Sequence, residues 1–140
     1  MKAAAADYVA LLEEFTNEGN AITLRVRGSS MLPAIPDGAV VRLQPLSEMP
    51  RVGEVIALRD PSGRMLCHRV VRVYRQEEQT WIQTWGDVSR EPDAAVPVSS
   101  VIGSVVAIVE DESGRAIATR PGWHIRARYL KRALRRLLSH

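Results

Sequence analysis

The spacing of hydrophobic residues changes from a helical to a strand-like period near residue 20. Residues 3–18 repeat apolar side chains at helical spacing, which predicts an amphipathic helix. The apolar face of this helix comprises Ala5, Tyr8, Val9, Leu12 and Phe15. Gly19 follows it and suits the left-handed cap that ends many helices.

Beyond residue 20, apolar and polar residues alternate, which is typical of half-buried strands. Strand-like runs occupy residues 22–27, 39–44, 54–58, 65–74, 80–84 and 101–109. Gly and Pro residues between these runs predict turns. Many short strands separated in this way favour a mainly β domain, built as a barrel or as paired sheets.

A second helical pattern follows Pro121 and Gly122. Its leucines and arginines fall on separate faces, which predicts a basic amphipathic helix over residues 123–138. Such a helix suits a membrane surface, a partner protein or the body of the protein itself, and the pattern leaves these open. We therefore expect three parts: an N-terminal helix in residues 1–20, a β domain in 21–120 and a C-terminal helix in 121–140.

Composition and charge narrow the class of protein. The 140 residues suffice for one domain with its own core. The net charge of +3 is uneven, because all 16 acidic residues precede residue 113. The basic tail lacks a nucleic-acid recognition motif, so we do not expect nucleic acid as a partner.

The apolar stretches are too short to suggest a membrane protein. No run reaches the roughly 18 apolar residues of a transmembrane helix. Asp7 interrupts the alanine-rich start, so we expect no signal peptide. These features predict a cytoplasmic protein, at most peripheral to the inner face of the membrane.

The densest candidate for chemistry is the segment 28–38, in which two glycines and two prolines surround Ser29 and Ser30. A stiff loop at the end of a strand can hold a serine as a nucleophile. The alternative is that one serine only caps the short turn that follows.

A serine nucleophile needs a base. The only lysines, Lys2 and Lys131, lie in the predicted terminal helices, and His68 is the one histidine of the β body. His68 is therefore the candidate base, against the alternative of a half-buried strand histidine with no catalytic role. Neighbouring strand residues face opposite ways, so we expect Cys67 to be a small buried apolar residue. As the single cysteine, it also excludes an intramolecular disulfide and a cysteine-based zinc site.

An imidazole base is usually oriented by an acid. The loop 84–93 offers Asp87, Glu91 and Asp93, and their spacing does not choose among them. The alternative is an ordinary solvated loop, in which acidic residues are common.

Taken in order, these segments resemble signal peptidase I, in the branch typical of the endoplasmic reticulum and archaea. The likeness spans about residues 22–109 and is carried by the segments 28–33, 52–57, 67–71, 84–93 and 102–105. In the first, a serine stands immediately before a methionine, as in the family's nucleophile motif. In the third, a histidine stands where bacterial members have lysine.

The resemblance implies a mainly β, signal-peptidase/LexA-like domain of short strands with flanking helices, and a serine endopeptidase without cofactor or metal. It makes Ser30 the nucleophile, His68 the base and Asp93 the acid that orients it. Asp87 becomes a second, supporting carboxylate. The backbone N–H of Ser30 supplies the oxyanion hole, with Ser29 as a second candidate donor. The substrate-binding residues we expect are Met31, Pro33, Ile56 and Leu66.

The implied substrate is an extended peptide, such as a leader or signal-like segment, bound beside the active-site strand. We find no counterpart of the family's membrane span, which favours peptide maturation in the cytoplasm. The rival function is a non-catalytic peptide-binding or dimerisation module of the same fold.

Overall fold

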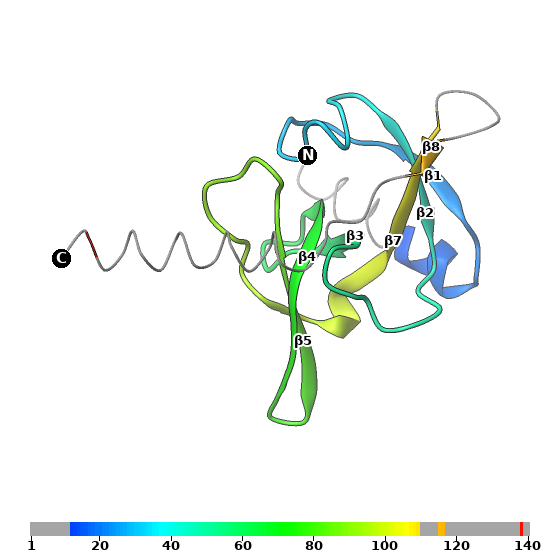
Figure 1. Ribbon diagram of the computed structural model, residues 1–140. Helices are drawn as coiled ribbons and strands as arrows, with labels where there is room; N and C mark the ends of the chain where they lie inside the picture. The colour runs from blue at the N-terminus through cyan, green and yellow to red at the C-terminus, as the bar shows by residue number, and fades with distance from the viewer. Residues whose placement is uncertain (1–11, 110–114, 117–137, 139–140) are drawn as a thin grey trace.

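Eight strands form one antiparallel sheet, which confirms the mainly β prediction (Figure 1). The structure is a computed structural model and describes residues 12–109, 115–116 and 138. The strands are β1 (Ile22–Arg25), β2 (Val40–Gln44), β3 (Val55–Arg59), β4 (Met65–Gln76), β5 (Gln79–Trp85), β6 (Val96–Pro97), β7 (Val101–Ile108) and β8 (Arg115–Ala116), with a 3-10 turn η1 (Val98–Ser100). Their order is β1-β2-β7-β3-β4-β5-β6, and β8 pairs with β7.

Six of these strands match the runs predicted from the alternation of apolar and polar residues. The two-residue strands β6 and β8 and the turn η1 were not predicted, because such short elements carry no periodicity. The predicted helix over residues 123–138 lies outside the described residues except for Leu138, as do residues 3–11 of the predicted N-terminal helix.

The described part of the N-terminal helix, residues 12–17, ends as its sequence predicts. Gly19 has a φ of 85°. Its N–H donates to the carbonyl of Thr16 at 3.0 Å, and the N–H of Asn20 donates to that of Phe15 at 3.1 Å. This pair of bonds is the Schellman cap, in which a left-handed residue closes the helix. The predicted role of Gly19 is therefore confirmed.

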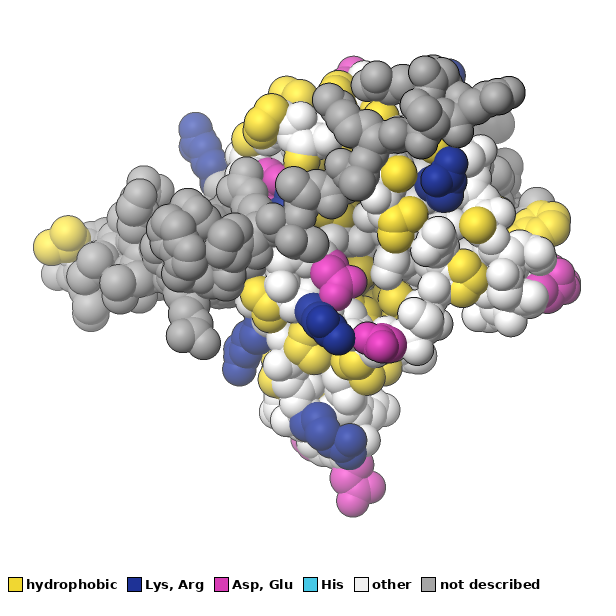
Figure 2. Space-filling view, turned by 45° about the vertical axis from the view of Figure 1, so that its right-hand side comes forward, with side chains coloured by type: hydrophobic (Ala, Val, Ile, Leu, Met, Phe, Trp, Pro, Cys, Tyr) yellow, Lys and Arg dark blue, Asp and Glu magenta, His cyan; other side chains and the backbone are white. Residues whose placement is uncertain are grey.

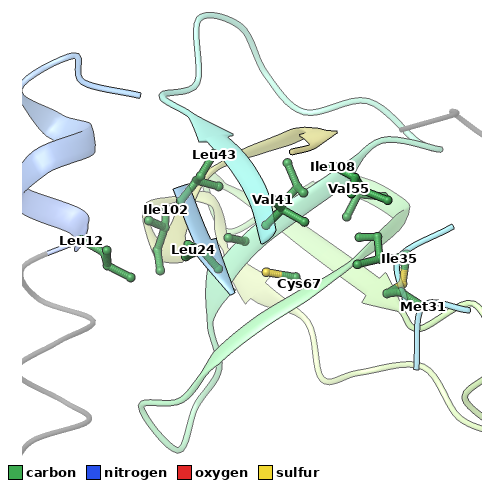
Figure 3. Close-up of a cluster of buried hydrophobic side chains, with 12 residues drawn as sticks. Leu12, Leu24, Met31, Ile35, Val41, Leu43, Val55, Cys67, Ile102 and Ile108 are labelled. Carbon is green, nitrogen blue, oxygen red and sulfur yellow. The ribbon is translucent and has the colours of Figure 1, made fainter. Parts of the chain in front are cut away.

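The sheet curls so that β3 is covered on both faces, which explains its uninterrupted apolar sequence. Val55 and Ala57 face a first cluster of buried side chains, and Ile56 and Leu58 face a second. The first cluster lies within the curl. Leu12 closes one end of it, and Met31 and Ile35, from the loop after β1, lie at the other end (Figure 3).

Strand β4 changes partners along its length. Its first residues, through Arg69, pair with β3, and its residues from Arg69 onward pair with β5. Beyond the sheet, β4 and β5 continue as a projecting hairpin (Figure 1), whose length carries both basic and acidic side chains (Figure 2). His68 thus stands one residue before β5 joins β4, at the point where the sheet opens.

Candidate active site

Two polar contacts close the base of the serine loop, residues 28–38, and one of them comes from β1. The N–H of Gly28 donates to the Oδ1 of Asp37 at 2.8 Å, and a guanidinium nitrogen of Arg25 donates to the carbonyl of Gly38 at 2.7 Å. Gly28 and Gly38 have φ values of 103° and 81°, which glycine adopts without steric cost. The loop that presents Ser30 is therefore fixed at both of its ends.

Two buried side chains anchor the same loop to the hydrophobic core. Met31 and Ile35 are 2% and 1% exposed and belong to the first cluster. The N–H of Ile35 donates to the carbonyl of Met31 at 2.9 Å, which forms a short turn. Met31 was predicted to bind substrate; its side chain packs in the core and does not line the groove beside Ser30, and its substrate contact stays a prediction.

Successive side chains of β4 lie in different environments, one in the apolar core and the next on the opposite face of the strand. Cys67 packs in the first cluster, which confirms that it is a buried apolar residue, and burial raises the pKa of its thiol to about 12. The thiol therefore stays protonated at neutral pH and is a poor nucleophile. His68 points to the opposite face, as strand geometry requires.

Ser30, His68 and Asp93 form a continuous hydrogen-bonded chain. The Oγ of Ser30 lies 2.9 Å from the Nε2 of His68, and the Nδ1 of His68 lies 2.6 Å from the Oδ2 of Asp93. A carboxylate only accepts, so Nδ1 carries the hydrogen and Nε2 accepts from the serine hydroxyl. The side chains of His68 and Asp93 are 11% and 20% exposed, so the chain of bonds is sheltered yet reachable.

Thr84 holds Asp93 in place and was not singled out from the sequence. Its hydroxyl donates to the Oδ2 of Asp93 at 2.8 Å, and its carbonyl accepts from the Asp93 N–H at 2.8 Å. The side-chain amide of Gln83 donates to the carbonyl of Asp93 at 3.1 Å. Thr84 is fully buried near the end of β5. The only sequence signal of its role is a threonine at the end of a strand-like run, directly before an acidic loop.

Asp87, predicted as a second, supporting carboxylate, contacts an arginine and not His68. The Nε and a terminal nitrogen of Arg69 donate to its two carboxylate oxygens at 2.8 and 2.9 Å. Both side chains are almost fully buried. Another nitrogen of Arg69 donates to the carbonyl of Gly53 at 2.7 Å. No pattern in the sequence indicates that Arg69, next to His68, turns inward and binds this carboxylate.

Gly86 lies directly against the Ser30–His68 pair. A Cβ built on Gly86 would stand 3.1 Å from the Nε2 of His68 and 3.1 Å from the Cβ of Ser30, and would collide with the Oγ of Ser89. The next residues also approach the site, because the N–H of Val88 donates to the carbonyl of Ser30 at 3.0 Å. Only glycine leaves room at position 86.

A groove of about 300 Å³ opens beside the hydrogen-bonded chain. It is lined by Arg25, Val26, Arg27, Ser30, Met65, Leu66, Cys67 and His68. Of the predicted substrate-binding residues, Leu66 therefore lines the groove. Ile56 is fully buried in the second cluster and does not line the groove, and its substrate contact stays a prediction. Pro33 is exposed in the serine loop.

The sequence of this chain matches a known protein family. A model of the peptidase S24-like family matches residues 2–106, more than half of the chain. The chain belongs to the peptidase S24-like family. No curated protein matches it. The match covers the S24-like peptidases as a whole and does not distinguish the signal peptidase I branch.

In this S24-like domain, the backbone N–H of Ser30 is free to donate a hydrogen bond. Within the described residues, no acceptor faces the N–H of Ser30, one of the predicted oxyanion donors. Ser29, the second candidate donor, is exposed, and its carbonyl accepts from the N–H of Leu32 at 3.2 Å. An oxyanion donor must be unpaired before substrate arrives, and the Ser30 N–H meets that condition.

Strand β4 of this S24-like domain has an open edge along the groove. Residues 65–68 pair with β3, and no described strand pairs with their other side. Val70 exchanges backbone hydrogen bonds with Gly53 and Glu54, at 2.8 and 2.7 Å. Because backbone groups alternate between the two edges of an antiparallel strand, Met65 and Cys67 direct theirs toward the groove.

The described residues form neither a metal site nor a membrane-spanning helix. Among the described residues, no cluster of histidine, cysteine, aspartate and glutamate has the arrangement of a metal site. No helix within the described ranges has the length and apolarity that crossing a bilayer requires.

Proposed function

We propose that this protein is a serine endopeptidase of the signal peptidase I type, with Ser30 as nucleophile, His68 as general base and Asp93 as the acid that orients it. The observation that carries the proposal is the pair of hydrogen bonds, 2.9 and 2.6 Å long, that joins the three side chains. The membership in an S24-like peptidase family supports it.

The first step follows from the tautomer of His68. The Oγ of Ser30 attacks the scissile carbonyl carbon, and its proton passes to the Nε2 of His68. The imidazolium that results is stabilised by the carboxylate of Asp93, which accepts from Nδ1. The carbonyl oxygen becomes an oxyanion, and the N–H of Ser30 donates to it.

Collapse of this intermediate breaks the peptide C–N bond, and the proton on Nε2 passes to the departing amine. The acyl chain is then bonded to the Oγ of Ser30. A water molecule gives its proton to Nε2 and attacks the ester carbon, which releases the new carboxyl end and restores the Ser30 hydroxyl. His68 thus acts in turn as base and acid in both halves of the reaction.

The substrate is an extended segment, such as a leader or signal-like peptide. An extended chain in the groove pairs its backbone with the open edge of β4 at Met65 and Cys67. The same chain passes Ser30 and His68, which line the groove. A helical segment presents no free backbone groups to this edge and is a poorer fit.

The test combines a serine-directed reagent with a cleavage assay. A fluorophosphonate probe should label the wild type and fail on Ser30→Ala and His68→Ala, because neither variant can form an activated serine. Cleavage of a mixed library of internally quenched peptides should fall about a thousandfold or more in both variants. Ser47→Ala, which changes an exposed serine between β2 and β3, is the matched control.

The rival function, a non-catalytic peptide-binding module, gives the opposite pattern. Such a module binds peptides, resists the reagent and shows no difference between the wild type and Ser30→Ala. Thermal unfolding of each variant confirms that a lost signal reflects chemistry and not a lost fold. Labelling that persists in Ser30→Ala would also overturn the assignment of the nucleophile.

A further inference from the structure

We propose that the groove selects an acidic peptide, in which Asp or Glu side chains alternate with small or apolar ones. The proposal rests on the proposed function, because the groove is the substrate site of that function. It goes beyond it by naming the charge and the spacing of the side chains that the site recognises.

The lining of the groove is cationic. It includes two arginines, Arg25 and Arg27, and no carboxylate. Arg25 uses one nitrogen to hold the carbonyl of Gly38, which leaves the rest of its guanidinium toward solvent. Arg27 is exposed and has no hydrogen-bond or ion-pair partner among the described residues. A free guanidinium beside a peptide site is complementary to a carboxylate.

The two strands that border the groove determine which side chains of a bound peptide face the arginines. Along β1 and its continuation, Leu24 and Val26 face the first apolar cluster, so Arg25 and Arg27 face the other side. Along β4, Cys67 and Met65 belong to the apolar face. Side chains of an extended peptide alternate in the same way. One set therefore meets the apolar face and the next set meets the arginines.

The backbone of the groove favours a peptide over a nucleic acid. Val26 exchanges backbone hydrogen bonds with Ala39 and Gly38, in the loop that precedes β2, each 2.8 Å long. Arg25 and Arg27 consequently direct their backbone groups outward, toward the groove. These groups and those of β4 match a peptide backbone. No aromatic side chain lines the groove to stack on a base.

A binding assay on Ser30→Ala measures recognition without cleavage. The probes are fluorescein-labelled decapeptides of alternating Ala-Glu, Ala-Gln and Ala-Lys, and a fourth with the alanines and glutamates in two blocks. Fluorescence anisotropy should rank alternating Ala-Glu first, about tenfold tighter than Ala-Lys, with the preference shrinking at high salt. The block peptide should bind more weakly than the alternating one, because only alternation keeps every glutamate on the arginine face.

A charge reversal assigns the preference to the groove. Combined with Ser30→Ala, Arg27→Glu should lower the ratio of Ala-Glu to Ala-Lys affinity to about one. The matched control is Arg75→Glu, which makes the same change in net charge at an exposed position near the tip of the β4–β5 hairpin. That variant should keep the wild-type ratio.

The outcomes separate this proposal from the proposed function. Equal affinity for the three charge types, a preference for Ala-Lys, or no binding at all overturns acidic selection. A single-stranded decathymidine that displaces Ala-Glu and binds more tightly assigns the groove to nucleic acid and also overturns it. Fluorophosphonate labelling of Ser30 in the wild type requires no peptide, so its success or failure judges the endopeptidase proposal alone.

Discussion

Two acid–base pairs stand side by side in this molecule and differ in almost every property. His68 and Arg69 are adjacent in β4, and their partners Asp93 and Asp87 come from the same loop. The His68–Asp93 side chains are 11% and 20% exposed, whereas those of Arg69 and Asp87 are 3% and 2% exposed. One strand and one loop thus build an open polar chain and a closed ion pair.

The difference teaches that two acid–base pairs from one strand and one loop can differ sharply in burial, and that only the less buried pair can be reached from solvent. Adjacent strand residues face opposite sides, so the two pairs cannot share an environment. The closed pair also joins the loop to the carbonyl of Gly53, through a third hydrogen bond of Arg69. It therefore positions the loop from which Asp93 reaches the open pair.

The largest expected effect comes from breaking the open pair. Asp93→Asn keeps the size of the side chain, but its amide can favour the wrong imidazole tautomer, as in other serine–histidine sites. We expect kcat to fall by about ten-thousandfold while the stability changes little. Cleavage kinetics and thermal unfolding measure the two effects separately. A variant with nearly full activity would remove Asp93 from the mechanism.

Breaking the closed pair should mainly lower the stability of the protein. Asp87→Ala leaves the guanidinium of Arg69 buried without its carboxylate, which costs about 3–5 kcal/mol of unfolding free energy. Urea denaturation measures the loss. The double variant Arg69→Met/Asp87→Leu, which removes both charges, should recover much of it. If Asp87→Ala is as stable as the wild type, the pair contributes nothing to the fold.

Sequence patterns were sufficient to predict which residues form the open pair, but not which residues form the closed one. The order of motifs brought Ser30, His68 and Asp93 into one hypothesis, and the structure has the three within hydrogen-bond distance. Their catalytic roles stay a prediction. The contact between Asp87 and Arg69 was not predicted, because nothing in the linear order of an acidic loop shows which carboxylate an inward-turned arginine will bind.

A smaller effect is expected at the contact between the loop and the open pair. Gly86→Ala places a methyl group against the Nε2 of His68 and the Cβ of Ser30. Overpacking of this kind costs about 1–3 kcal/mol, and here it displaces the reacting groups. We expect kcat/KM to fall about tenfold to a hundredfold. Gly63→Ala, in a turn with open space around the added Cβ, is the comparison: it can lose stability through its positive φ but should keep activity.

The smallest effect is expected at Thr84. Thr84→Val removes the hydroxyl that donates to Asp93 while keeping the shape of the side chain. One neutral donor to a carboxylate is worth about 1.5 kcal/mol, so kcat should fall roughly tenfold. Thr84→Ser, which retains the hydroxyl, should restore most of the rate. Equal rates in the valine and serine variants would show that the hydrogen bond does not position Asp93.

The strands were predictable because their alternation is a local property, whereas side-chain destinations depend on packing between distant segments. Ile56 illustrates the limit. Its run was predicted as one more half-buried strand, yet its residues are apolar without a break, because the curl of the sheet covers both faces of β3. A residue expected at the substrate is therefore in the core, and only the path of β4 and β5 over that face reveals it.

The open stretch of β4 has one more consequence, for the behaviour of the protein at high concentration. Unpaired strand edges are sites where identical chains join and aggregate, and proteins protect them by keeping them short and flanked by charge. Here the unpaired stretch is residues 65–68, and Arg25 and Arg27 stand across from it. Two copies approaching edge to edge would bring like charges together. The arginines would then act as gatekeepers against self-association, whatever peptide the groove accepts.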